Sequence, residues 1–243
     1  MIARLCGVGK RYGKRPPVTA LRNVTLAVAQ GQRLLIAGES GSGKSTLARC
    51  LAGWETPDEG TIEVIGGARP QLIPQEPATS LNPYWTALAI VEEPYRIRGL
   101  NKRTGEHRAT EWLSRVELPP DCANRLSGQA SGGEQARLAI ARALAALTLD
   151  GAQPGLLIFD ESFSALDEAL RIRLFDLLMK LRDTLPVAYA FLSHDLAITA
   201  RFVDSIAVMH QGEVVEYGGA AQLLAKPASA ALQRLVAALE GPA

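Results

Sequence analysis

The sequence has little that would support an extracellular, metal-bound or membrane-spanning protein. Its three cysteines, Cys6, Cys50 and Cys122, are widely spaced and form no metal-ligand pattern, so we expect reduced thiols. The first residues lack the apolar stretch of a signal peptide. No apolar run reaches membrane-span length, because Arg142 and Asp150 interrupt the longest candidate. Any membrane role would therefore come through a partner.

An excess of charge of one sign is also lacking. Lys and Arg total 26 and Asp and Glu total 25, which gives a formal net charge of +1. Such a chain has no global field to attract nucleic acid or anionic lipid. Its 243 residues, 47% of them hydrophobic and 21% charged, suit one large α/β domain with a substantial core.

Short apolar runs alternate with segments of helical spacing. Strands are expected at 24–29, 33–37, 61–65, 70–75, 156–161, 187–193, 206–209 and 213–217. One helix is expected directly after a glycine-rich turn, which spans 38–45. Further helices are expected over 168–185, from residue 195 and from residue 220. The last two strands predict a hairpin around Gln211-Gly212.

The composition and residue spacing differ in the segment from about Pro83 to Ala146. This segment is rich in Ala, Leu, Arg and Glu at helical spacing, and we expect Pro94, Gly99, Pro119 and Pro120 to break it. We therefore predict a single α/β domain over 1–243, with a mostly parallel sheet, an antiparallel β part and a helical subdomain inserted at 83–146.

The glycine-rich turn predicts a phosphate site. Residues 38–45 fit the pattern G-x-x-x-x-G-K-[ST], in which glycines let backbone N–H groups wrap a phosphate at a helix N-terminus. Lys44 is expected to reach the β- and γ-phosphates, and the Ser45 hydroxyl to ligate Mg²⁺. The expected nucleotide-binding segment consists of Gly38, Glu39, Ser40, Gly41, Ser42, Gly43, Lys44, Ser45 and Thr46.

A second carboxylate-bearing segment supports this site. The apolar run from Leu156 ends in Asp160-Glu161. Beside a phosphate loop, Asp160 is expected to hold Mg²⁺, and Glu161 to orient and polarise the attacking water. The expected chemistry is hydrolysis of a nucleoside triphosphate with Mg²⁺.

The stretch from Ala130 to Leu144 indicates which class of P-loop nucleotide hydrolase the chain resembles. It reads ASGGEQARLAIARAL, which resembles the LSGGQ signature and basic helix of the ATP-binding (ABC) transporter ATPases. The resemblance implies a RecA-like P-loop NTPase fold and a head-to-tail dimer. In such a dimer, Ser131, Gly132 and Gly133 of one subunit would meet the γ-phosphate held by the other.

Other family elements follow in order along nearly the whole chain. Tyr12 resembles the aromatic residue that stacks on adenine, and Gln75 the glutamine that senses Mg²⁺ and the attacking water. Asp167, in Ser164-Ala165-Leu166-Asp167, matches the loop that communicates across the dimer. His194 resembles the switch histidine that contacts the γ-phosphate. Read alone, Asp167 is equally well a helix N-cap.

Several positions depart from the family pattern. The signature has Ala130 for Leu and Glu134 for Gln, and Ser162-Phe163 stands where Pro-Thr is usual. A carboxylate at 134 would weaken γ-phosphate capture if it faced the nucleotide. A poorly hydrolysing regulatory subunit is therefore an alternative within the family, although the residues assigned to hydrolysis are retained.

The segment 75–83, QEPATSLNP, is similar to that of the ATPases of the oligopeptide, dipeptide and nickel importers. The resemblance implies transmembrane permease subunits, a second ATPase subunit, a substrate-binding protein and a place on the cytoplasmic face of the membrane. Alternatives are a soluble ABC ATPase without membrane subunits and a P-loop kinase, which does not explain Ser131-Gly132-Gly133. The sequence leaves open the cargo, the direction of transport, and whether the dimer is of like or unlike chains.

Overall fold

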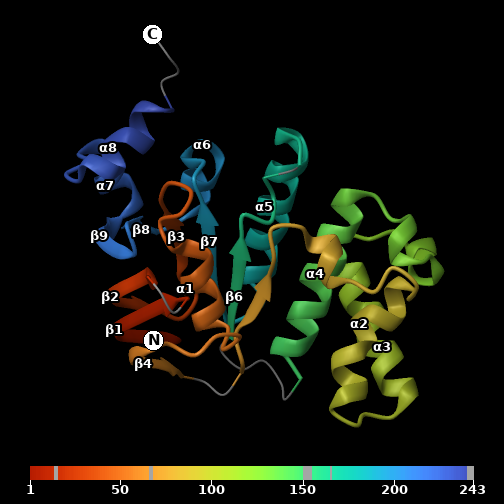
Figure 1. Ribbon diagram of the computed structural model, residues 1–243. Helices are drawn as coiled ribbons and strands as arrows, with labels where there is room; N and C mark the ends of the chain where they lie inside the picture. Colours follow the sequence, from red (N-terminus) through yellow and green to blue (C-terminus); the bar gives the residue numbers. More distant parts are fainter. Residues whose placement is uncertain (14–15, 66–67, 150–154, 165, 240–243) are drawn as a thin grey trace. The chain divides into compact units, whose positions relative to one another are not determined.

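The computed structural model describes residues 1–13, 16–65, 68–149, 155–164 and 166–239 (Figure 1). The chain forms two compact units. The first comprises Met1–Leu72, Pro154–Asp160 and Val187–Ala243, and the second comprises Ile73–Gln153 and Glu161–Pro186. The second unit contains the segment 83–146 and extends beyond it on both sides.

The first unit carries the strands. Its elements are β1 (Ala3–Tyr12), β2 (Val18–Val28), β3 (Arg33–Ala37), α1 (Lys44–Leu51), β4 (Glu59–Val64), β5 (Gln71–Ile73, which ends in the second unit), β6 (Gly155–Asp160), β7 (Val187–Ser193), α6 (Leu196–Thr199), a 3₁₀ turn (Ala200–Phe202), β8 (Ser205–His210), β9 (Glu213–Gly219), α7 (Ala220–Ala225) and α8 (Ala230–Ala237). The strands that the sequence predicts are all present within a few residues.

The strands form a six-stranded sheet in the order β5-β6-β7-β3-β8-β9. The pairs β6–β7, β7–β3 and β3–β8 are parallel, and β8–β9 is the predicted antiparallel hairpin. Strands β6, β7 and β3 are almost wholly buried, as expected for parallel strands covered on both faces. A separate antiparallel sheet has the order β2-β1-β4.

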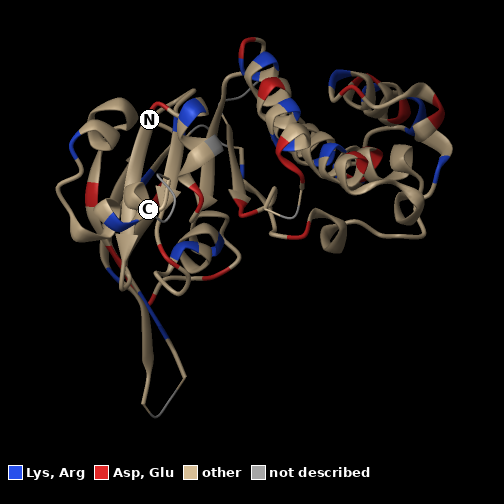
Figure 2. Ribbon diagram, turned by 90° about the horizontal axis from the view of Figure 1, so that it is seen from above, with Lys and Arg blue, Asp and Glu red and all other residues tan. Residues whose placement is uncertain are grey.

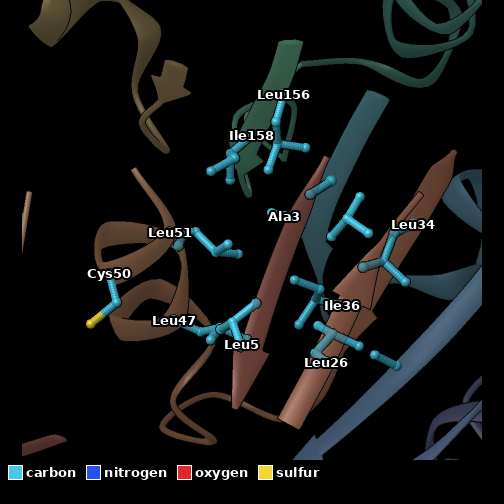
Figure 3. Close-up of a cluster of buried hydrophobic side chains, with 14 of the residues drawn as sticks. Ala3, Leu5, Leu26, Leu34, Ile36, Leu47, Cys50, Leu51, Leu156 and Ile158 are labelled. Carbon is cyan, nitrogen blue, oxygen red and sulfur yellow. The ribbon is translucent and has the colours of Figure 1, made fainter. Parts of the chain in front are cut away.

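Helix α1 packs on the strands through residues one turn apart. Leu47 and Leu51 lie on one face because they are separated by four positions. Figure 3 shows these side chains directed toward Leu5 of β1, with Ile36 of β3 and Ile158 of β6 in the same cluster. All five side chains are buried, and each such residue stabilises the fold by roughly 1.5–3 kcal/mol. This core fixes the start of α1, where the phosphate loop ends.

The second unit is helical in its described part. Its elements are a 3₁₀ turn (Pro77–Ser80), α2 (Ala87–Ile97), α3 (Lys102–Arg115), 3₁₀ turns at Pro120–Asn124 and Ser127–Gln129, α4 (Gly132–Leu147) and α5 (Glu168–Arg182). Figure 2 shows basic and acidic residues interspersed along helices, in keeping with the near-neutral charge. No helix in the described ranges has both the length and the apolarity needed to cross a bilayer.

The expected break at Pro94 is wrong. Helix α2 continues through Pro94 to Ile97 and ends before Gly99, whose φ is +83°. A proline inside a helix removes one backbone hydrogen bond, so it persists only where packing offsets that cost. Pro94 is buried, and so is the adjacent Tyr95, whose hydroxyl accepts a hydrogen bond from Trp112 Nε1 of α3 at 2.8 Å. This packing holds the helix together.

Candidate nucleotide-binding and ATPase site

The phosphate loop joins β3 to α1. Lys44, the first residue of α1, is buried, and its Nζ donates to the carbonyls of Gly38 (2.7 Å) and Glu39 (3.0 Å). Gly43 has a φ of +102°, and a Cβ there would lie 2.4 Å from the Ala20 carbonyl oxygen. Only glycine fits that position, so the curled loop follows from the sequence.

The loop offers donors to an anion. Ser42 Oγ is buried and has no hydrogen-bond partner within the described ranges. The N-terminal end of α1 adds the positive end of the helix dipole. Behind the loop, the Gly212 N–H donates to the Ser42 carbonyl oxygen at 3.0 Å. A buried unpaired hydroxyl, a lysine and a helix start together fit a phosphate group.

Two of the residues expected to bind Mg²⁺, Ser45 and Asp160, belong to the first unit and contact each other. Ser45 Oγ, in the first turn of α1, donates to Asp160 Oδ1, at the end of β6, at 2.9 Å. Hydroxyl and carboxylate oxygens are the donors that Mg²⁺ prefers. The pair therefore fits a magnesium ion bound beside the phosphate loop.

His194 lies at the same edge of the sheet. Ala37 pairs with Ser193, and Asp160 pairs with Leu192, on parallel strands. Gly38 and His194 directly follow the paired residues Ala37 and Ser193, so both lie at the carboxyl ends of their strands, β3 and β7. His194 is exposed. Ligands of α/β proteins bind at this edge of a parallel sheet.

Tyr12 ends strand β1, and its hydroxyl hydrogen-bonds to Glu55. Burial, and next this hydrogen bond, raise the pKa of Tyr12. Glu55 also accepts from Arg49 Nη1 at 3.1 Å. Burial alone would raise the pKa of Glu55, but the bonds from Tyr12 and Arg49 outweigh it, so the pKa is lowered. Tyr12 keeps 37% exposure, which leaves it accessible for the predicted adenine stacking.

In the second unit, Ser162 joins the segments of Gln75 and Glu161. Ser162 Oγ is buried and donates to the Ile73 carbonyl oxygen at 2.7 Å. Gln75 follows Ile73 by two residues and is exposed. Glu161 has a φ of +50°, a left-handed conformation that is uncommon for a non-glycine residue and often marks functional sites. The departure from proline at 162 thus supplies a polar link between two site segments.

The signature residues lie against the start of α5. Ser131 is the N-cap of α4 and is exposed. Gly133 is buried, and a Cβ there would lie 2.7 Å from Leu170 Cδ2. Asp167 caps α5 by accepting from the Leu170 N–H at 2.9 Å. The structure therefore brings Ser131, Gly133 and Asp167 into one region.

The Glu134 carboxylate is bound within its own helix cap. Its Oε2 accepts from the Ser131 N–H at 2.8 Å, and the Glu134 N–H donates to Ser131 Oγ at 3.3 Å, which completes a capping box. Its Oε1 accepts from Arg125 Nη2 at 2.6 Å. The Ser131 bond, followed by the Arg125 bond, lowers the pKa of Glu134 to about 2. The Ser131 hydroxyl hydrogen stays available for a phosphate oxygen.

Residue patterns did not reveal every contact around these segments. Arg125, Gly212 and Arg234, which contacts the loop residue Glu39, were not among the expected site residues. Arg234 acts through a partner 195 positions away, Gly212 acts through its backbone, and Arg125 lies outside the signature motif, so no local motif marks any of them. Ser162 was visible only as a departure from the family pattern.

Comparisons with known proteins agree with the geometry. The sequence profile of the family described as "ABC transporter" matches residues 21–164. A Sinorhizobium fredii protein named as a probable peptide ABC transporter ATP-binding protein is 37% identical over 242 residues, covering 93% of this chain and 67% of that protein. A nickel import ATP-binding protein of Rhodospirillum rubrum is 37% identical over 243 residues, covering 92% and 85%.

Solved structures show the same fold. A dimeric ATP-binding cassette in a post-hydrolysis state, bound to ADP and Pi, matches with a TM-score of 0.77 and 29% identity. The match covers 90% of this chain and 99% of that one.

The phosphate loop, the carboxylate at the end of β6 and the parallel sheet define a P-loop nucleotide-binding protein. Within that class, the chain belongs to the ABC transporter family. It is an ATP-binding ATPase of that family, which confirms the resemblance seen in the sequence.

Proposed function

We propose that the chain hydrolyses ATP at a two-subunit interface to power import of peptides or nickel. The observation that carries the proposal is the hydrogen bond from Ser45 to Asp160, which joins the phosphate loop to the end of β6. The names of the peptide and nickel relatives support the cargo class. This chain would lie on the cytoplasmic face of the membrane, bound to permease subunits that span it. A substrate-binding protein could complete the transporter.

The residues of one chain would prepare the phosphate for attack. Lys44 and the loop N–H groups would bind the β- and γ-phosphates, with Tyr12 stacking on adenine. Ser45, Asp160 and Gln75 would hold Mg²⁺, with Asp160 acting through water. When bound, Mg²⁺ would neutralise charge on the β- and γ-phosphate oxygens.

The attack would depend on Glu161 and His194. Glu161 would accept a hydrogen bond from water and orient it toward the γ-phosphorus, while His194 would contact the γ-phosphate. The water oxygen would bond to phosphorus, the bond from phosphorus to the β-phosphate oxygen would break, and ADP would leave with a phosphate that carries the water protons. Ser131, Gly132 and Gly133 of the second subunit would close over the γ-phosphate, with Asp167 communicating across the dimer.

The test of catalysis is Glu161→Gln. The variant keeps a side chain of the same shape but removes the carboxylate, so we expect ATP binding to be retained and turnover to fall by about 10²-fold or more. Lys44→Ala is the control and is expected to lose binding as well. Normal hydrolysis by Glu161→Gln, with the dimer intact, contradicts the role of Glu161.

The test of the machine is a pull-down from the native cell. Tagged Glu161→Gln protein is solubilised in detergent with ATP and Mg²⁺, and its partners are identified by mass spectrometry. Multi-span membrane proteins and a second ATPase are expected, and their identity indicates the cargo. Recovery of soluble proteins alone, where control membrane complexes survive, contradicts the transporter function and leaves a soluble ABC ATPase.

A further inference from the structure

The phosphate loop carries one acidic side chain, that of Glu39. Its carboxylate Oε1 accepts a hydrogen bond from Arg234 Nε of α8 at 2.8 Å, across 195 positions of sequence. Both side chains are 51% exposed. The C-terminal helix therefore contacts the nucleotide-binding loop directly through an ion pair.

Helix α8 is held firmly enough to present this arginine. Glu216 of β9 accepts from the N–H groups of Ala228 (3.1 Å) and Ser229 (2.8 Å), at the start of the helix. Ser229 caps the helix by accepting from the Leu232 N–H at 3.1 Å, and Leu232 is fully buried. Figure 1 shows α7 and α8 beside β8 and β9. Helix α7 packs against both strands, and α8 packs against β8. The position of Arg234 is thus set by the body of the first unit.

A carboxylate in a phosphate loop opposes the binding of a polyanion. Glu39 lies in the loop between Gly38, whose carbonyl accepts from Lys44, and the start of α1. Arg234, and to a lesser degree His210, lower the pKa of Glu39, so the carboxylate is ionised at neutral pH. An unpaired Glu39 would repel the phosphates that Lys44 attracts.

We propose that Arg234 is a positioning residue for ATP, which compensates the charge of Glu39 and turns its carboxylate toward α8. The proposal rests on the phosphate site proposed above. An exposed ion pair stabilises a fold little, so the effect of this pair is expected in nucleotide affinity rather than in folding. Helix α8 would then raise the affinity of the phosphate site for ATP through Glu39, without contacting the nucleotide itself.

The experiment measures the Kd of MANT-ATP with Mg²⁺, by fluorescence, on the full chain at low and high salt. Arg234→Ala is expected to raise Kd about threefold to tenfold at low salt, and less at high salt, because screening weakens the repulsion. Adding Glu39→Gln to Arg234→Ala is expected to restore Kd to near the wild-type value. Arg234→Lys, which keeps the charge, is expected to rescue it in part.

Lys180→Ala is the matched control, because it removes the cation of another exposed ion pair, that with Glu117 at 3.0 Å. Its Kd is expected to be unchanged. Glu39→Gln alone keeps the loop backbone and α8, removes the carboxylate and leaves Arg234 as an uncompensated cation, so its Kd is expected to fall below the wild-type value. A Kd that rises in this variant contradicts the charge argument, even if Arg234→Ala fails to fold.

An unchanged Kd in Arg234→Ala overturns the proposal. A raised Kd that Glu39→Gln does not restore also overturns it, because Arg234 would then act without Glu39. The two proposals fail separately. If Lys44→Ala still binds MANT-ATP, the phosphate site is wrong. If Lys44→Ala loses binding while Arg234→Ala does not, only the inference about Arg234 is wrong.

Discussion

At the residue scale, Glu134 shows how the structure resolves a question that the sequence leaves open. The sequence places a carboxylate where the family usually has glutamine, and a local pattern does not say which way it points. The structure binds that carboxylate to the Ser131 N–H and to Arg125. The side chain therefore orders the signature helix cap and is not free to approach a phosphate.

We predict a pH-dependent effect of Glu134→Gln on stability. The pKa of Glu134 in the folded protein is about 2, below the ordinary value of 4.5. Its contribution is therefore complete above about pH 5 and is lost as the pH falls toward 2. Urea unfolding is expected to show a loss of about 1–2 kcal/mol near neutral pH that shrinks by about pH 3. An equal difference at both pH values contradicts the assignment.

Ser162 gives a second prediction at this scale. Ser162→Ala removes the hydrogen bond to the Ile73 carbonyl, close to Gln75. Because a slight displacement of a catalytic group slows the reaction, we expect kcat to fall about threefold to tenfold with little change in KM. Steady-state ATPase kinetics provide the measurement, with Ser114→Ala, at an exposed position of α3, as control. A normal kcat would show that the link does not position Gln75.

At the scale of elements, the sequence predicts most strands and helices because period and turn residues are local. The turn at Gln211-Gly212 has positive φ at both residues, as a tight hairpin requires. The prediction fails at Pro94, since tertiary packing overrides a local rule there. The pairs Arg125–Glu134, nine positions apart, and Arg234–Glu39, 195 positions apart, could not be predicted, because no spacing in the sequence encodes which charged side chains meet.

The packing of α2 on α3 gives a prediction for Tyr95→Phe. Removing the hydroxyl leaves the buried Trp112 Nε1–H without its acceptor, so we expect a loss of about 1–3 kcal/mol in the free energy of unfolding. Chemical denaturation measures the loss. Tyr84→Phe is the control, since Tyr84 is 83% exposed, and it is expected to change little. Equal stabilities of the two variants would show that the hydrogen bond contributes nothing.

At the scale of the whole molecule, the fold, the family and ATPase activity follow from sequence and structure together. Cargo and partners are proposed from the names of the relatives and from the segment 75–83, because the contacts that select a cargo would lie on other chains. The motif residues are assigned by pattern, and the roles proposed for them depend on a second subunit that would supply Ser131.

We predict that ATP drives dimerisation of the Glu161→Gln variant. Blocked turnover would leave both nucleotides in place between the subunits, so light scattering after gel filtration is expected to show a dimer with ATP and a monomer without it. Lys44→Ala is expected to stay monomeric in both conditions. A Glu161→Gln monomer at saturating ATP argues against a dimer of like chains and favours an unlike partner.

The bond from the Gly212 N–H to the Ser42 carbonyl has a consequence of its own. It joins the phosphate loop to the β8–β9 turn through main-chain atoms alone, so no side chain encodes it. Replacing the side chain of Gln211 leaves both bonded atoms in place. At Gly212, by contrast, a Cβ would lie 2.8 Å from the Ala20 carbonyl oxygen. This support of the loop therefore depends on the backbone conformation. Substitutions of the surrounding side chains that keep this conformation leave the hydrogen bond intact.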